Sequence, residues 1–95
     1  MNVIPIDNSK PIFNWCPDIE EEALNQMKNL AKLPFVEHCA LMPDAHLGVS
    51  MPIGGVLATM GVIIPNAVGV DVGCGLAAFK TNLKIEDIQG KPPTI

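Results

Sequence analysis

The chain has 95 residues, of which 48% are hydrophobic and 17% charged, and its formal net charge is −4. A soluble globular domain usually carries about 25% charged residues, so this chain is unusually poor in charge. Its basic residues are all lysines, scattered at positions 10, 28, 32, 80, 84 and 91. The acidic balance and the absence of arginine exclude a basic nucleic-acid-binding patch made by this chain alone.

The cysteines and the apolar segments indicate the cellular compartment of the protein and whether it spans a membrane. Cys16, Cys39 and Cys74 form no C-x-x-C pair and cannot all pair with one another, which favours a reducing compartment, and we expect a cytoplasmic protein. The first ten residues lack the basic and apolar regions of a signal peptide. The apolar run from 47 to 70 contains prolines and glycines and no helical stripe, so we expect no membrane span.

The first third of the chain predicts two short strands and a helix. Residues 2–6 and 11–15 are strand candidates, interrupted by Pro5 and Pro11. A helix is predicted from about 18 to 33, with Asp18 as the N-cap, glutamates in the first turn, and Pro34 ending it. Its apolar face is formed at helical spacing by Ala23, Leu24, Met27, Leu30 and Ala31.

The remainder predicts strands separated by turns. Residues 35–42 read as a strand that leads into a proline-bounded turn over 42–48. Residues 54–65 are either a strand with its turn or a hairpin, and 69–81 are a strand broken by glycines. Residues 82–95 read as a strand end, a short acidic turn and a Pro-Pro stretch, with 84–95 as a connector. The expected fold class is α+β, a mixed sheet with one main helix.

The segment from 47 to 79 contains a single formally charged residue, Asp71. A chain of this size would struggle to cover so much apolar sequence by itself. We therefore expect the segment to be buried against something that the sequence does not supply, either a partner subunit or the remainder of a longer protein.

Asp71 and Cys74 lie three residues apart in this segment, and Gly73 and Gly75 flank the cysteine. Glycine permits backbone geometries that bulkier residues forbid, so a turn can bring the carboxylate and the thiolate to one point. A cation there would offset the cost of burying both anions. The competing interpretations are an inert cysteine and a turn-forming aspartate. A divalent ion also needs further ligands from elsewhere.

The chain offers two histidines as further donors. His46 follows Asp44 by two residues in a Pro- and Gly-bounded stretch that could point both side chains into a pocket, although Asp44 could equally bond its own backbone. His38, next to Cys39, is expected to be structural. A Cys74 nucleophile with His46 as its base is a weaker alternative. Dinucleotide, P-loop and nucleophile-elbow motifs are absent.

The run LPFVEHCALMPDAHLGVSMPIGGVLATMGVIIPNAVGVDVGCGLAAFKT, residues 33–81, closely resembles the N-terminal signature region of the RtcB family of RNA-splicing ligases. The helix EEEALNQMKNLAKLPF resembles the segment that precedes that region. The resemblance rests on three motifs, M-P-D-x-H-x-G, V-I-P-x-A-V-G-V-D and G-C-G, and covers most of the chain from about Glu20 onward.

The resemblance implies a ligase that uses Mn²⁺ and GTP and joins an RNA 3′-phosphate or 2′,3′-cyclic phosphate end to a 5′-hydroxyl end, by way of a guanylylated histidine. It implies that Asp71 and Cys74 are metal ligands, with the Cys74 sulfur bridging two manganese ions. A bridging thiolate shares its charge between two cations, which suits this soft ligand better than a terminal bond to manganese. Asp44 and His46 match the M-P-D-x-H motif and are assigned a supporting role near the metals.

The departure from the family is length. Its members are several times longer, and their remaining metal-binding histidines, the guanylylated histidine and most GTP contacts lie downstream of this region. We therefore expect residues 1–95 to be the N-terminal segment of an RtcB-like ligase domain, inactive alone, with no catalytic or cofactor-binding residue of its own. Its partner would be the missing C-terminal portion or another subunit. Two alternatives stay open: a non-catalytic module that docks or forms a homo-oligomer, and a small metal-binding protein.

Overall fold

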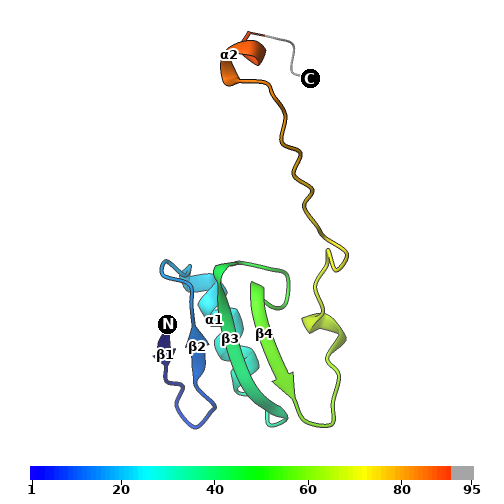
Figure 1. Ribbon diagram of the computed structural model, residues 1–95. Coiled ribbons are helices and arrows are strands. Elements are labelled where there is room, and N and C mark those ends of the chain that lie inside the picture. The colour runs from blue at the N-terminus through cyan, green and yellow to red at the C-terminus, as the bar shows by residue number, and fades with distance from the viewer. Residues whose placement is uncertain (91–95) are drawn as a thin grey trace.

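The computed structural model describes residues 1–90, in which α1 packs on one face of a four-stranded sheet (Figure 1). The elements are β1 (Asn2–Ile4), β2 (Ile12–Asn14), α1 (Glu21–Ala31), β3 (Val36–His46), β4 (Ile53–Thr59), the 3-10 turn η1 (Pro65–Ala67) and α2 (Ile85–Ile88). Residues 91–95 of the predicted connector lie outside the described part. The predicted α+β class is confirmed.

The sheet is mixed and its strands follow chain order, β1-β2-β3-β4. The β1/β2 and β3/β4 pairs are antiparallel, whereas β2 and β3 are parallel. Parallel neighbours need a crossover connection, and α1 supplies it. The β2-α1-β3 unit is therefore the body that positions the rest of the chain.

The helix is shorter than predicted at its N-terminus. It begins at Glu21, with Glu20 as the N-cap, so the expectation of Asp18 as N-cap was wrong. Ile19 packs against the core cluster, which holds the chain in a non-helical approach before the first turn. At the other end Lys32 is the C-cap, and Pro34 disfavours helical geometry at the residue before it.

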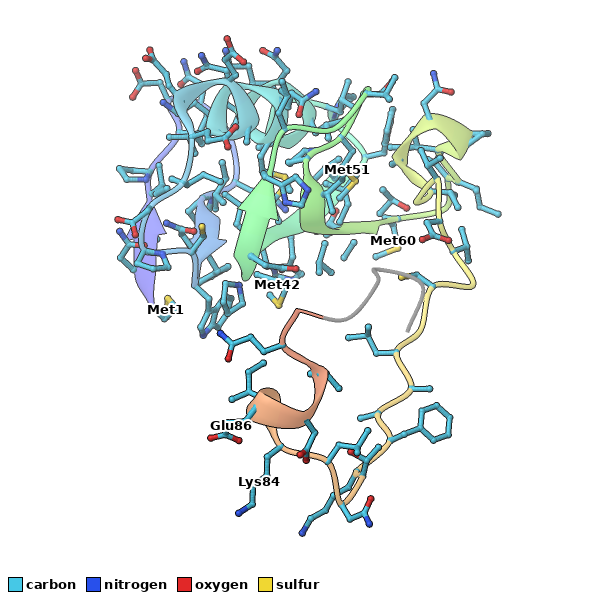
Figure 2. All side chains as sticks on the ribbon, turned by 90° about the horizontal axis from the view of Figure 1, so that it is seen from above. Met1, Met42, Met51, Met60, Lys84 and Glu86 are labelled. Carbon is cyan, nitrogen blue, oxygen red and sulfur yellow. The ribbon has the colours of Figure 1, made fainter. Side chains whose placement is uncertain are left out.

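The core lies between α1 and the sheet. Met27 of α1 is fully buried together with Ile12 of β2 and Leu41 of β3. Figure 2 shows Met51 on the α1 side of the sheet and Met42 on the opposite side. The predicted apolar face of the helix is therefore the face that packs, and it covers only one side of the sheet.

The other face of the sheet carries an apolar row that spans all four strands. Val3 pairs with Phe13, Phe13 with Ala40, and Ala40 with Val56, so these four side chains share the face opposite the core. Val3 and Val56 are each about half exposed, at 50% and 51%. A sheet face with this composition is normally covered, and nothing in residues 1–90 covers it.

The predicted turn over 42–48 was wrong, because β3 continues to His46. The β3/β4 register is irregular between Leu41 and His46. A proline cannot donate to a regular ladder, so this irregular stretch accommodates Pro43 within the strand. For 54–65, the strand with a following turn is correct: β4 ends at Thr59, and Gly61 takes a positive φ of 69°.

Residues 68–84, called the arm below, lead away from the sheet to α2 (Figure 1). The strand predicted over 69–81 was wrong within the described chain, because a strand needs a neighbouring edge and this segment pairs with none there. Val70 and Phe79 are 92% and 86% exposed. The radius of gyration is 18.6 Å, against about 12 Å for a compact domain of this length.

The acidic turn predicted near the C-terminus is the single helical turn α2. The backbone N–H of Lys84 donates to Asp87 Oδ2 at 2.8 Å, and the N–H of Asp87 returns a bond to the Lys84 carbonyl at 3.0 Å. Neither α2 nor α1, the helices within residues 1–90, is long and apolar enough to cross a membrane.

Candidate metal centre

Asp71 and Cys74 occupy the two ends of one turn in the arm. The backbone N–H of Cys74 donates to the carbonyl oxygen of Asp71 at 3.1 Å, which is the closing bond of a β-turn. A turn of this kind holds its first and fourth residues close together. The local backbone therefore places the two residues close together, and the convergence of their carboxylate and thiol stays a prediction.

The surroundings of this turn are open. Asp71 and Cys74 are both exposed, and a β-carbon added at Gly69, Gly73 or Gly75 would meet no atom within 4 Å. Neither Gly73 nor Gly75 has a positive φ, so the turn itself does not require glycine there. Small residues in open space leave room for other atoms to approach the two donors.

Asp44 and His46 lie at the end of β3. The Nδ1 of His46 is 2.8 Å from the carbonyl oxygen of Asp44. A carbonyl can only accept, so Nδ1 carries the hydrogen and the Nε2 lone pair is free in the neutral ring. Both side chains are exposed. His46 Nε2 and the Asp44 carboxylate are therefore accessible to other groups.

The carboxylate of Asp44 lies against β4. A β-carbon at Gly54 would be 3.2 Å from Asp44 Oδ1 and 3.0 Å from the Ala45 Cα, and Gly54 has a positive φ of 78°. Both the crowding and the backbone conformation favour glycine. Gly54 therefore lets the Asp44 side chain approach the neighbouring strand.

These two donor pairs do not form a single cluster in this chain. Among residues 1–90, no group of three or more His, Cys, Asp or Glu side chains is placed to hold a metal ion. Asp71 and Cys74 belong to the arm, whereas Asp44 and His46 belong to the sheet. The thiolate and carboxylate of one turn fit a metal ion as a partial donor set, and a complete set needs further ligands.

The other two cysteines are part of the core. Cys16 and Cys39 are buried and Cys74 is exposed. Cys16 Sγ lies 3.7 Å from the Ala45 carbonyl oxygen, and burial raises the pKa of the Cys39 thiol. Reactivity and metal binding require the thiolate, so Cys74 is the thiol best placed for either.

A residue that the sequence reasoning missed is Gln26 of α1. Its side-chain amide bonds the backbone of Gly48 and Val49, just beyond His46. Gln26 directly precedes Met27, at the edge of the predicted apolar face. A polar residue beside a buried stripe, able to both donate and accept, was the available signal.

The chain was compared with known proteins. Residues 26–94 match the family model described as tRNA-splicing ligase RtcB. The RNA-splicing ligase RtcB of Escherichia coli strain K12 is 48% identical over 81 residues, which are 82% of this chain and 20% of that protein. The tRNA-splicing ligase RtcB of Archaeoglobus fulgidus is 39% identical over 75 residues, 75% of this chain and 16% of that protein.

A third relative is similar over most of the chain. The RNA-splicing ligase RtcB homolog 1 of Entamoeba dispar is 39% identical over 93 residues, 93% of this chain and 17% of that protein. The chain thus spans about a fifth or less of the length of these curated relatives. No solved structure matches the chain.

Proposed function

Because this chain belongs to the RtcB family, we propose that it forms the N-terminal part of an RNA ligase that uses Mn²⁺ and GTP. The complete enzyme would join an RNA 3′-phosphate or 2′,3′-cyclic phosphate end to a 5′-hydroxyl end. The observation that carries the proposal is the Asp71–Cys74 turn, which lies inside the part of the chain that matches the family. As an isolated chain, it would be inactive.

Asp71 and Cys74 would hold the metal in this proposal. When bound, manganese would act as a Lewis acid on phosphate oxygens and offset their negative charge. The Cys74 thiolate would be one ligand, and the Asp71 carboxylate would add a hard oxygen donor, which manganese prefers. The 3.1 Å backbone bond keeps the two ends of the turn close, which would help both donors to reach one ion.

Asp44 and His46 would support the centre from β3. The Nδ1–H bond to the Asp44 carbonyl orients the His46 ring and leaves Nε2 to accept a hydrogen bond or donate its lone pair. Such orientation of a histidine through its second nitrogen is common around metals. Asp44 and His46 would thus add polar groups beside the metal centre, whose ligands Asp71 and Cys74 belong to the arm.

Two uncovered apolar regions support the view that the chain is part of a larger body. One is the sheet face around Phe13 and Val56, and the other is the arm with Val70 and Phe79. The two relatives are about four to five times as long as this chain, because 82% and 75% of the chain cover 20% and 16% of them. The proposed occupant of both regions is the remaining sequence of a complete ligase. Three free cysteines support a reducing, cytoplasmic location.

The test is a chimera in which this chain replaces the matching segment of the Escherichia coli relative. We expect RNA ligation that depends on Mn²⁺ and GTP, and a loss greater than the roughly 10- to 100-fold typical of outer-shell changes when Cys74→Ala or Asp71→Asn is introduced. Cys16→Ala serves as the control, because that thiol is buried in the core. Full activity in the Cys74→Ala chimera would refute the assignment.

The exposed arm also suits a second candidate function, a non-catalytic module that associates through its apolar surfaces. Light scattering on the isolated chain distinguishes the two. Self-association at a defined stoichiometry that persists when the rest of a ligase is supplied favours the module. Replacement of the self-association by a one-to-one complex with the rest of the ligase favours the fragment.

A further inference from the structure

The loop between β3 and β4 is held by one side chain of α1. Gln26 Nε2 donates to the Gly48 carbonyl at 2.8 Å and to the Val49 carbonyl at 3.3 Å. Gln26 Oε1 accepts from the backbone N–H of Gly48 at 3.1 Å. Both ends of the amide are used, so Gln26 bonds Gly48 as a neighbouring strand would.

The loop is also tightly folded where it is held. A β-carbon at Gly48 would lie 2.0 Å from the Met51 carbonyl oxygen and 3.3 Å from the Ile53 backbone nitrogen. Backbone atoms cannot move aside as a flexible side chain can, so this fold of the loop requires glycine. The Gly48 backbone is therefore fixed by Met51 and Ile53 on one side and by Gln26 on the other.

His46 lies two residues before this fixed point and pairs with Ile53 across the sheet. Its ring bonds the Asp44 carbonyl through Nδ1 at 2.8 Å. That bond is exposed and competes with water, so by itself it stabilises one ring orientation only weakly. The pairing of His46 with Ile53 and the fixed backbone at Gly48 can supply a further constraint.

We propose that Gln26 is a positioning residue that holds the Gly48 loop and thereby keeps His46 in the tautomer with a free Nε2. Its importance for catalysis rests on the proposed function, in which His46 supports the metal centre. The proposed effect of Gln26 on the His46 ring does not depend on that function. The experiment therefore reads the ring directly, and failure of this inference is distinguishable from failure of the ligase assignment.

Two substitutions separate the features of the amide. Gln26→Glu keeps the shape and an acceptor for the Gly48 N–H but places a carboxylate against the Gly48 and Val49 carbonyls. Gln26→Met keeps the length and removes all three bonds. Asn25→Asp and Asn25→Met make the matching changes at an exposed position of the same helix.

The measurement is ¹⁵N NMR of the full chain at about pH 8, where an unperturbed imidazole is neutral. The parent chain is expected to give the Nδ1–H tautomer at His46. Both Gln26 variants are expected to populate the Nε2–H form. Gln26→Met, which removes the acceptor for the Gly48 N–H, should also speed exchange of that amide roughly five- to tenfold, as for loss of one ordinary hydrogen bond. The exposed His38 ring and both Asn25 variants should show neither change.

Amide spectra of β2 and β3 report whether each variant is folded. If Gln26→Met does not fold, the result for Gln26→Glu, the variant closest in shape, decides the test. An Nε2–H tautomer in the parent chain would overturn the inference. Unchanged His46 ring signals in folded Gln26→Glu would also overturn it. Equal changes at His38 and His46 would indicate general loosening of the sheet and would count against it in the same way.

Discussion

The backbone N–H of Cys74 bonds the carbonyl of Asp71 across 3.1 Å, so the carboxylate and the thiol share one turn. This relationship is local and does not depend on the sheet, which the arm leaves behind. A donor pair formed by four consecutive residues can be carried intact into a larger protein. The remaining ligands must come from other parts of that protein.

Substitutions at the end of β3 are expected to weaken a complete ligase without abolishing its activity. His46→Gln removes the free Nε2 lone pair, and Asp44→Asn removes a charge, while Asp71 and Cys74 stay in place. Each should lower ligation by the chimera roughly 10- to 100-fold, as outer-shell changes do. Ligation rates at saturating Mn²⁺ check this. Losses equal to that of Cys74→Ala would make His46 or Asp44 a direct ligand, contrary to the present assignment.

Truncation of Met27 is expected to destabilise the body of the chain. Its side chain is fully buried among Ile12, Leu41 and the rest of the core, and Met→Ala in such a site costs about 2–5 kcal/mol. Met60→Ala is the matched control, because Met60 is 69% exposed and surface changes usually fall within about 0.5 kcal/mol. Urea unfolding followed by circular dichroism compares them. Equal midpoints for the two variants would contradict the observed packing.

Alkaline pH is expected to destabilise the chain through Cys39. Burial raises the pKa of this thiol in the folded state, so the unfolded chain loses its proton first, from about pH 8.5 upward. The folded state then binds more protons than the unfolded state, and the free energy of unfolding falls as pH rises. Below that range the contribution is fully present. Urea unfolding at pH 7 and at higher pH should show a smaller decline in Cys39→Ala than in the parent, and identical declines would refute the cause.

The pKa of Glu37 is expected to respond to Lys10. A 2.9 Å hydrogen bond from the Lys10 ammonium, together with its charge, lowers the pKa of this carboxyl. The stabilising contribution is present above the ordinary carboxyl range and is lost as pH falls through the lowered value. Lys10→Gln should return the pKa of Glu37 toward the ordinary value of a glutamate carboxyl, measured by NMR titration of the side chain. A pKa that stays low in Lys10→Gln would contradict this pairing.

Local signals in the sequence predicted the elements that depend on local physics. The apolar spacing around Met27 predicted the helix face, and Pro34 predicted its end. The first residue of the helix was missed because Ile19 is held by tertiary packing, a contact that capping preferences do not contain. β3 was underestimated because Pro43 usually marks a turn, whereas an irregular ladder admits it here.

The strand expected around Cys74 did not form for a different reason. Its composition favours a strand, but a strand needs a neighbour, and the described chain offers the arm none. The turn that joins Asp71 and Cys74 could be predicted from the motif alone, because a turn of four residues requires no distant partner. Gln26 escaped notice because its role depends on the tertiary approach of α1 to the Gly48 loop.

The central claim is that Asp71 and Cys74 share a cation in a larger protein. Its most direct test is cobalt binding by the chimera, followed through the absorption that a thiolate–cobalt bond produces. We predict a thiolate–cobalt band that disappears in Cys74→Ala, weakens in Asp71→Asn and persists in Cys16→Ala. A band of full intensity in Cys74→Ala, or none in a folded parent chimera, would contradict the claim.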